Sequence, residues 1–231
     1  MRYEKFQEAE FLARPNRFVA VVRTKAGEEL KVHVPNTGRC REIFVPHARV
    51  LLQRSSNPQR KYPYTLYAAY KGSRLIQVDS AAANKLVAEA LQSGRIAQLL
   101  GATEVEREKT FASSRFDFRF KRSEKICYME VKGVTLESHD IALFPDAPTP
   151  RGVRHLRELA LAVREGYDAY VLFVMQMAGI RYFTPHAERD PAFASALKEA
   201  SQAGVKILAY DAKVTPGEIL LAKEVPVKLE V

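Results

Sequence analysis

The sequence predicts an α/β protein of the mixed α+β kind, in which a small β-barrel precedes an α/β layer with a mixed central sheet. Short strand-like segments separated by turns fill residues 1–80, whereas helix-like and strand-like segments alternate in residues 81–231. The charge divides at the same place. Residues 1–80 hold 15 Lys/Arg against 7 Asp/Glu, a net of +8, and residues 81–231 hold 21 against 20, a net of +1. We therefore predict two domains, residues 1–80 and residues 81–231.

The first domain is predicted to be a barrel of the oligonucleotide-binding (OB) type. Residues 17–22 and 29–34 flank an Ala26-Gly27 turn and form a predicted hairpin. Three more strands are predicted at residues 49–54, 63–70 and 74–78. Five short strands in about 75 residues fit a small barrel that binds its ligand with one strand face and the adjacent loops.

The segment from Arg54 to Tyr64 mixes cations with aromatic and small polar side chains. Cations offset phosphate charge and tyrosine rings stack on bases, so this segment is a candidate nucleic-acid contact. The alternative is an ordinary exposed loop with tyrosines anchored by prolines. The candidate DNA-binding residues of the domain are Asn36, Arg39, Arg54, Asn57, Arg60, Lys61, Tyr62 and Tyr64.

The second domain is predicted from alternating helical and extended patterns. Residues 81–91 carry a helical apolar stripe closed by Gly94, and Thr149-Pro150 opens a helix that ends at Gly166. A third helix is predicted over residues 191–200. The predicted strands are residues 104–109, the hairpin 115–134, the apolar run 169–177, residues 205–210 and a short β tail within residues 212–231.

The hairpin over residues 115–134 carries the strongest chemical signal. Its apolar faces pair if Phe120 lies opposite Cys127 and Phe118 opposite Met129, which places Asp117 opposite Glu130. Like charges at that spacing are destabilising, and a divalent cation would compensate them. Lys132 follows on the same face, two residues beyond Glu130. The alternative is a solvated strand face, because Asp followed by Glu-x-Lys is a common chance pattern.

Composition limits the class of protein. No apolar run approaches the roughly 18 residues that a membrane crossing requires. The N-terminal segment has three glutamates and no apolar core, so it is not expected to be a secretory signal. Cys40 and Cys127 are expected to be buried and reduced, which favours a cytoplasmic protein.

Several separated motifs together resemble the sugar fermentation stimulation protein A (SfsA) family. The motifs are Pro35 to Arg39, Ser55 to Pro58 with Lys61 to Tyr64, Arg115 to Asp117, Glu130 to Lys132, Ala142 to Ala147, and Arg151-Gly152 with His155 to Leu159. The resemblance implies an OB-like barrel followed by a domain resembling the PD-(D/E)xK nucleases. It also implies DNA binding with little sequence preference and a part in regulating sugar (maltose) metabolism.

The same resemblance assigns candidate site residues. Asp117 and Glu130 become metal carboxylates and Lys132 the catalytic lysine, with Mg²⁺ or Mn²⁺ as cofactor. Glu89 matches the extra metal-binding glutamate that some of these nucleases take from the preceding helix. Phe116 stands where proline is common before the aspartate. Asp146, His155 and Gln176 are supporting candidates, for each of which a purely structural role is the alternative.

Two functions of different classes follow. The first is a non-catalytic DNA-binding protein that contacts mainly the DNA backbone and retains a nuclease-like metal site. The alternative is an active Mg-dependent endonuclease that cleaves DNA phosphodiesters. The sequence leaves RNA, a homodimer and association with the nucleoid open.

Overall fold

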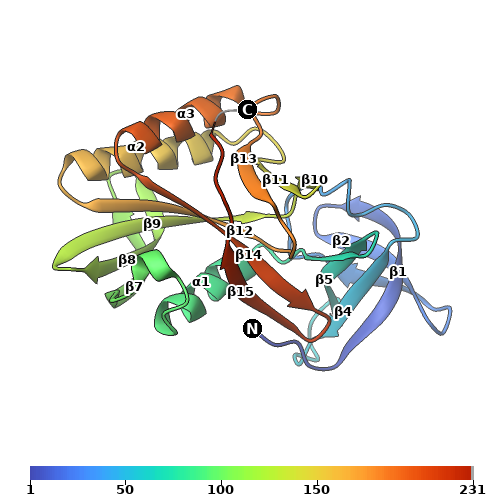
Figure 1. Ribbon diagram of the computed structural model, residues 1–231. Helices are drawn as coiled ribbons and strands as arrows, with labels where there is room; N and C mark the ends of the chain where they lie inside the picture. Colours follow the sequence, from blue (N-terminus) through green and yellow to red (C-terminus); the bar gives the residue numbers. More distant parts are fainter. Residues whose placement is uncertain (230–231) are drawn as a thin grey trace.

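The computed structural model describes residues 1–229. Figure 1 shows a β-barrel, in blue and cyan, beside an α/β layer whose sheet lies between helices. The expected β tail over residues 212–231 contains the strand β15 (Glu218–Glu224). Residues 230 and 231 of that predicted range lie outside the described residues. In residues 1–229 no helix combines the length and the apolar character that a membrane crossing needs.

Five strands close the barrel in the order β3-β2-β1-β4-β5. A parallel pairing of His33 in β3 with Thr65 in β5 completes the closure. The predicted hairpin of residues 17–22 and 29–34 is confirmed as β2 and β3, and Gly27 takes a φ of 86° at its turn. The strands are β1 (Phe6–Asn16), β2 (Val19–Thr24), β3 (Glu29–His33), β4 (Arg49–Arg54) and β5 (Tyr64–Lys71).

One part of the barrel prediction is wrong. The strand predicted over residues 74–78 exists as β6 (Arg74–Gln77), but it pairs only with the outer edge of β5 and does not close the barrel. The missing barrel strand is β1, which the sequence analysis left unassigned. Its pairing with β2 shifts register twice, and these irregularities hide the period-2 pattern in the sequence.

The second part of the chain is built on a six-stranded mixed sheet in the order β15-β14-β12-β9-β8-β7. Strands β14, β12 and β9 pair in parallel, whereas β15 with β14, β9 with β8 and β8 with β7 pair antiparallel, so the sheet is mixed, as predicted. The strands are β7 (Thr103–Phe111), β8 (Ser114–Arg122), β9 (Lys125–Val134), β12 (Asp168–Met175), β14 (Lys206–Thr215) and β15 (Glu218–Glu224).

Helices cover both faces of this sheet (Figure 1). Helix α1 (Ala82–Gln92) packs on the face that carries Phe118 and Met129, and α2 (Pro150–Arg164) and α3 (Pro191–Gln202) pack on the other. The predicted start of α2 is confirmed, because Pro150 is its first residue and the Thr149 hydroxyl accepts from the N–H of Gly152 at 3.1 Å. A 3₁₀ turn, η1 (Ala97–Leu99), follows α1.

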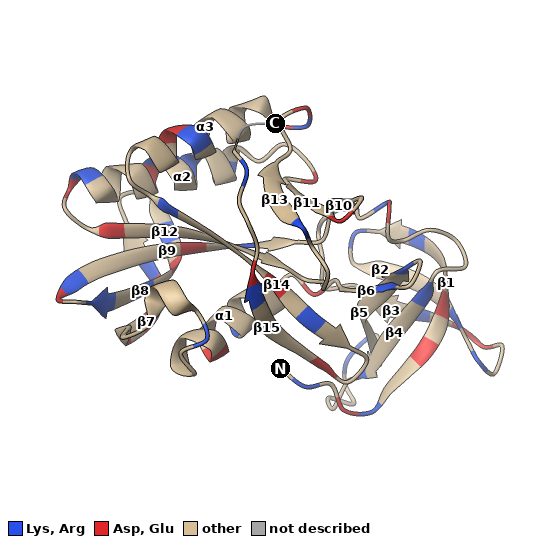
Figure 2. Cartoon of the chain, in the orientation of Figure 1, with Lys and Arg blue, Asp and Glu red and all other residues tan. Residues whose placement is uncertain are grey.

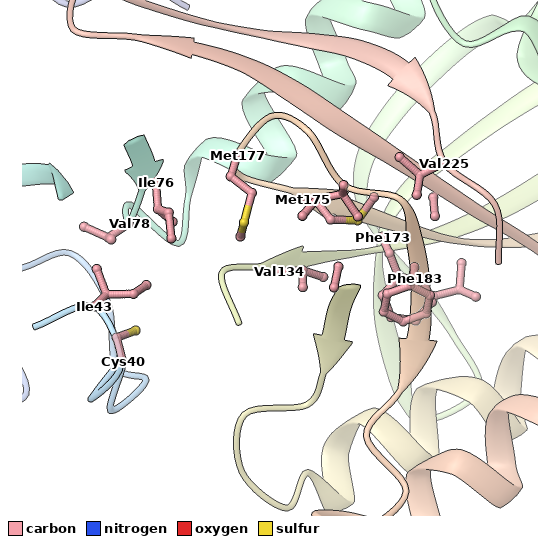
Figure 3. Packing of buried hydrophobic residues seen from close by; sticks show 14 of the residues in the cluster. Cys40, Ile43, Ile76, Val78, Val134, Phe173, Met175, Met177, Phe183 and Val225 are labelled. Carbon is pink, nitrogen blue, oxygen red and sulfur yellow. The ribbon is translucent and has the colours of Figure 1, made fainter. Parts of the chain in front are cut away.

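The α/β part contains a small second sheet, and a shared core joins the two parts. The sheet consists of β10 (Glu137–Ser138), β11 (Ile141–Phe144) and β13 (Tyr182–Pro185), which the sequence analysis missed. One hydrophobic cluster contains Ile43 and Val78 from the barrel side together with Val134 and Phe173 from the α/β side. Figure 3 shows these side chains lying along the boundary. Burial of this apolar area therefore fixes how the barrel sits against the α/β layer.

Candidate metal centre and nucleic-acid interface

The β8–β9 hairpin positions the two candidate carboxylates. The predicted register is confirmed, since Phe120 pairs with Cys127 and Phe118 with Met129. Asp117 follows at the end of this ladder, where its carboxylate Oδ2 accepts the backbone N–H of Val131 at 2.8 Å. The buried phenylalanines on β8 thus hold Asp117 beside Glu130, the residue that precedes Val131 on β9.

Asp117 sits in an environment that disfavours its charge. Burial, followed by the neighbouring charge of Glu130, raises the pKa of Asp117 from 3.8 to about 6. Two donors oppose this effect, the N–H of Val131 and the side-chain amide of Asn84, whose Nδ2 lies 2.6 Å from Asp117 Oδ1. Asn84 belongs to the first turn of α1, so this helix reaches directly into the site.

Glu130 is 5% exposed and its two oxygens differ sharply. Oε1 accepts from Lys132 Nζ at 2.7 Å and faces His155 Nδ1 at 2.5 Å, whereas the buried Oε2 has no hydrogen-bond partner. Burial opposes the charged form, but the His155 hydrogen bond and the Lys132 charge outweigh it and hold the pKa of Glu130 below its usual value. A buried, ionised oxygen without a partner marks a place for a bound group.

His155 contacts Glu130 on the face of the sheet that α2 covers. The Nε of Arg151 lies 3.3 Å from His155 Nε2, and a guanidinium only donates. Nε2 is therefore the acceptor, so Nδ1 carries the ring proton and donates it to Glu130. Both residues lie in the first turns of α2, and His155 is 1% exposed. His155, a supporting candidate, thus contacts Glu130 directly.

Glu89 lies away from this pair. Its carboxylate forms an ion pair with the amino group of Met1 at 2.9 Å, and its side chain is half exposed. Five residues separate it from Asn84, a rotation of about 140° around the helix. Within residues 1–229, no group of three or more His, Cys, Asp and Glu side chains is close enough to hold a metal ion. The acidic donors at the centre are therefore Asp117 and Glu130.

A cleft of about 510 Å³ lies between the barrel and the α/β layer, and its lining includes Gly133, the residue after Lys132. It is lined by Asn36 and Arg39 from the barrel and by Gly133, Asp146 and Gln176 from the α/β layer, which brings four predicted residues together. Arg39 is exposed at the cleft, whereas Asn36 is partly structural, because its side chain donates to Val78 and accepts from Gly38.

Two side chains hold the walls of this cleft. Gln176 is buried and donates to the carbonyls of Gln77 and Asp79, each at 3.0 Å, so it ties β12 to the segment before α1. Arg14, which was not predicted, donates to three carbonyls of the opposite loop, those of Asn36, Gly38 and Arg39, and to the carbonyl of Arg17 in the turn after β1. Its only sequence signal is a cation in a barrel strand, which does not reveal such long-range partners.

A second hollow of about 930 Å³ lies on the barrel beside the predicted DNA-binding loop. Arg54, Asn57 and Arg60 line it. The ammonium group of Lys61 lies over the ring of Tyr62, and Tyr64 is partly buried against the core. This second hollow, a groove on the barrel, is lined in part by Pro35 and Asp79. The residues that follow them in the chain, Asn36 and Ser80, line the cleft, so a narrow wall of these residues separates the groove from the cleft.

Several cations of the barrel are already neutralised. Figure 2 shows acidic and basic residues interspersed on β1 and its neighbours. Arg23 pairs with Glu10 and Glu29, and Lys25 pairs with Glu8. Within the part of the chain that the structure describes, the candidate phosphate contacts form no ion pair; they are Arg39, Arg54, Arg60 and Lys61.

Family models divide between the two parts of the chain. The SfsA N-terminal OB domain matches residues 12–78, and the sugar fermentation stimulation protein RE domain matches residues 81–218. The fold is accordingly an OB-type barrel followed by an α/β domain with a mixed sheet.

Whole-length relatives agree with these matches. A sugar fermentation stimulation protein homolog of Clostridium kluyveri is 47% identical over 98% of this chain and 99% of its own length. A homolog from Thermoanaerobacter sp. is 49% identical over 95% of both chains. The solved structure of Pyrococcus furiosus SfsA in complex with Ca²⁺ is 29% identical, with a TM-score of 0.90 over 99% of this chain and 98% of the other. The chain belongs to the sugar fermentation stimulation protein family.

Proposed function

We propose that this protein binds DNA with little sequence preference and carries a divalent metal centre of nuclease type at Asp117, Glu130 and Lys132. The observation that carries the proposal is the buried Oε2 of Glu130, which is ionised and has no partner while a second carboxylate lies beside it. We further propose that residues 1–80 and residues 81–231 divide these tasks. The proposed connection to sugar metabolism comes from the family name, and the proposed location is the cytoplasm, in keeping with two free, buried cysteines.

The donor set suits a hard cation. Mg²⁺ and Mn²⁺ prefer oxygen ligands, and Mg²⁺ is often held by one or two carboxylates together with water and substrate phosphates. Asp117 and Glu130 supply the carboxylates. The related Pyrococcus furiosus protein is described in complex with Ca²⁺, which supports a divalent site in the same family. A bound divalent cation would polarise a phosphate oxygen and lower the pKa of bound water.

The protein side chains have separate roles in this proposal. Lys132 Nζ, 2.7 Å from Glu130 Oε1, lies where it would orient a water molecule or stabilise extra charge on a phosphate. His155 and Lys132 both occupy Oε1, which leaves Oε2 of Glu130 directed toward the cation. The helix α2 fixes this arrangement because its buried stripe packs on the same face of the sheet as Glu130.

The DNA backbone is proposed to follow the barrel into the cleft. Arg54 and Arg60 line the groove, Lys61 follows Arg60 in the chain, and Arg39 lines the cleft. None of these cations has to break an ion pair within the described chain in order to contact a phosphate, so each contributes its full charge. Backbone contacts of this kind carry little sequence information.

Cleavage is the second function that this centre supports, and a plasmid assay distinguishes it from binding alone. Supercoiled DNA is incubated with the protein and Mg²⁺ or Mn²⁺, beside Asp117→Ala and the matched variant Glu89→Ala. A nuclease gives metal-dependent nicking that Asp117→Ala loses and Glu89→Ala keeps. DNA binding without nicking in all three proteins would favour a non-catalytic DNA-binding protein that binds through the basic barrel and not through the metal centre. Nicking by Asp117→Ala at the parent rate would refute the proposed centre.

A further inference from the structure

The turn of α1 that faces the carboxylate pair carries an amide in place of a third acid. Asn84 is half-buried and its Nδ2 lies 2.6 Å from Asp117 Oδ1. The adjacent Ala83 packs near Gly133 at the end of β9, which holds this end of the helix against the site. Asn84 is therefore held at the centre by the position of its backbone and by the hydrogen bond from its terminal amide to Asp117.

The centre is short of ligand oxygens. A divalent cation of this class takes at least six ligands, and an asparagine carbonyl is an accepted ligand for such ions. The acids available are Asp117 and Glu130, because no group of three metal-binding side chains of the His, Cys, Asp and Glu types exists in residues 1–229. Glu89, the acidic residue expected from this helix, instead pairs with the Met1 amino group.

The distance between Asn84 and Asp117 suits two ligands of one cation. Bonds of about 2.1 Å in an octahedron place neighbouring ligand oxygens about 3 Å apart. The torsion at the end of an asparagine side chain is broad and roughly two-fold, so a half-turn exchanges the nitrogen and the oxygen with little displacement. After that turn, Oδ1 of Asn84 would lie beside Asp117 Oδ1 on one edge of the coordination shell.

We propose that Asn84 is a metal-binding residue whose amide turns between two partners. Without a cation its Nδ2 donates to Asp117 and relieves the crowding of negative charge. With a cation its Oδ1 becomes a neutral third ligand beside Asp117 and the unpartnered Oε2 of Glu130. This inference rests on the metal centre proposed above and adds a donor from α1.

Calorimetric titration with Ca²⁺ and with Mn²⁺ tests the assignment without reference to cleavage. Asn84→Ala and Asn84→Ser should weaken binding about tenfold, and Asn84→Asp should tighten it about tenfold, because ligand number and charge set the affinity of such sites. Lys85→Gln is the matched control, since it makes the net charge more negative by one unit at the next, exposed position of α1. It should change the dissociation constant less than twofold.

The outcomes separate the inference from the proposed centre. A parent protein that binds neither ion would refute the centre itself. Loss of binding in Asp117→Ala would support the centre. If, in addition, Asn84→Asp bound the ion no more tightly than the parent or than Lys85→Gln, the Asn84 assignment would be refuted and the centre would stand. In the parent, Ca²⁺ should also shift the side-chain amide signals of Asn84 in a ¹⁵N correlation spectrum. An unchanged Asn84 signal at saturating Ca²⁺ would likewise refute the assignment.

Discussion

His155 donates its Nδ1 proton to Oε1 of Glu130 at 2.5 Å, and this contact determines which oxygen of the glutamate faces the site. Lys132 uses the same oxygen, so Oε2 is left buried and without a partner. On the neighbouring strand, Asp117 has its pKa raised to about 6 by burial and by the charge of Glu130. The pair thus combines one firmly ionised carboxylate with one that titrates near neutrality.

The raised pKa of Asp117 predicts a pH-dependent stability of the metal-free protein. A folded-state pKa above the unfolded value means that this group stabilises the fold fully below pH 4 and loses that contribution as the pH rises through about 6. The loss amounts to at most about 3 kcal/mol. Other carboxylates titrate in the same range, so the comparison uses Asp117→Asn, which lacks the titrating group.

Urea unfolding in EDTA at pH 4 and pH 7 measures this effect. The difference in the free energy of unfolding, Asp117→Asn minus parent, should be about 2–3 kcal/mol larger at pH 7 than at pH 4, which means that the variant gains relative stability as the pH rises. Glu108→Gln, an exposed acid on β7, serves as the control and should show no such change. A difference between Asp117→Asn and the parent that stays constant across this range would contradict the raised pKa.

Acid should also weaken metal binding. A proton on Asp117 competes with the cation, and its pKa of about 6 places the competition within an accessible range. We expect the affinity for Mn²⁺ to fall about tenfold for each pH unit below 6 and to level off above 7. Calorimetry at pH 5.0, 5.5, 6.5 and 7.5 measures this. Affinity that does not change between pH 5 and pH 7.5 would show that Asp117 does not bind the ion.

His155 should act through Glu130. Removal of the donor in His155→Leu should lower Mn²⁺ affinity about tenfold or more, as expected for a partner that orients a metal ligand. His155→Asn keeps a donor near the position of Nδ1 and should recover part of that affinity. Arg151→Lys, which loses the Nε contact but keeps the charge, should have a smaller effect. Equal affinities for His155→Leu and the parent would show that the histidine has only a packing role.

The barrel cations should govern the salt dependence of DNA binding. Lys61→Glu and Arg54→Glu should each weaken binding to unrelated duplexes to a similar extent and reduce the slope of log affinity against log salt by about 1. Arg164→Glu changes the charge by the same amount at the exposed end of α2 and should have little effect. Fluorescence anisotropy at several salt concentrations provides these values. A loss confined to one DNA sequence would indicate base recognition instead of backbone binding.

Gly133 should be required for the wall of the cleft. A Cβ at this position would collide with Oε1 of Gln176, which is held in place by its donations to Gln77 and Asp79. Gly133→Ala should therefore lower the free energy of unfolding by about 1–3 kcal/mol. Gly217→Ala is the control, because a Cβ there would meet its nearest neighbour only at 3.8 Å. Denaturant unfolding would contradict this prediction if the two variants were equally stable.

The alternating pattern of the hairpin made its register predictable. Phe116, Phe118 and Phe120 are all fully buried, and the pairing of Phe118 with Met129 follows from matching the apolar faces. Helices α1 and α2 were predictable for the same kind of reason, because an apolar stripe and a Thr-Pro start are local signals. These features depend on residues close together in the sequence.

The features that the sequence did not reveal depend on distant partners. Strand β1 has irregular pairing, and β10, β11 and β13 are too short to show a periodic pattern. Asn84 lies 33 residues from Asp117, and a single asparagine in a helix gives no sign of such a contact. Glu89 matched the sequence pattern of the family, but the direction of its side chain depends on how α1 packs.

Anomalous diffraction from crystals grown with Mn²⁺ tests the central claim most directly. We expect a peak about 2.2 Å from Oε2 of Glu130 and from a carboxylate oxygen of Asp117, with Asn84 Oδ1 turned toward it. The same experiment on Glu130→Gln should show this peak strongly reduced. No anomalous peak between Asp117 and Glu130 in the parent, with Mn²⁺ bound elsewhere on the protein, would contradict the proposed metal centre.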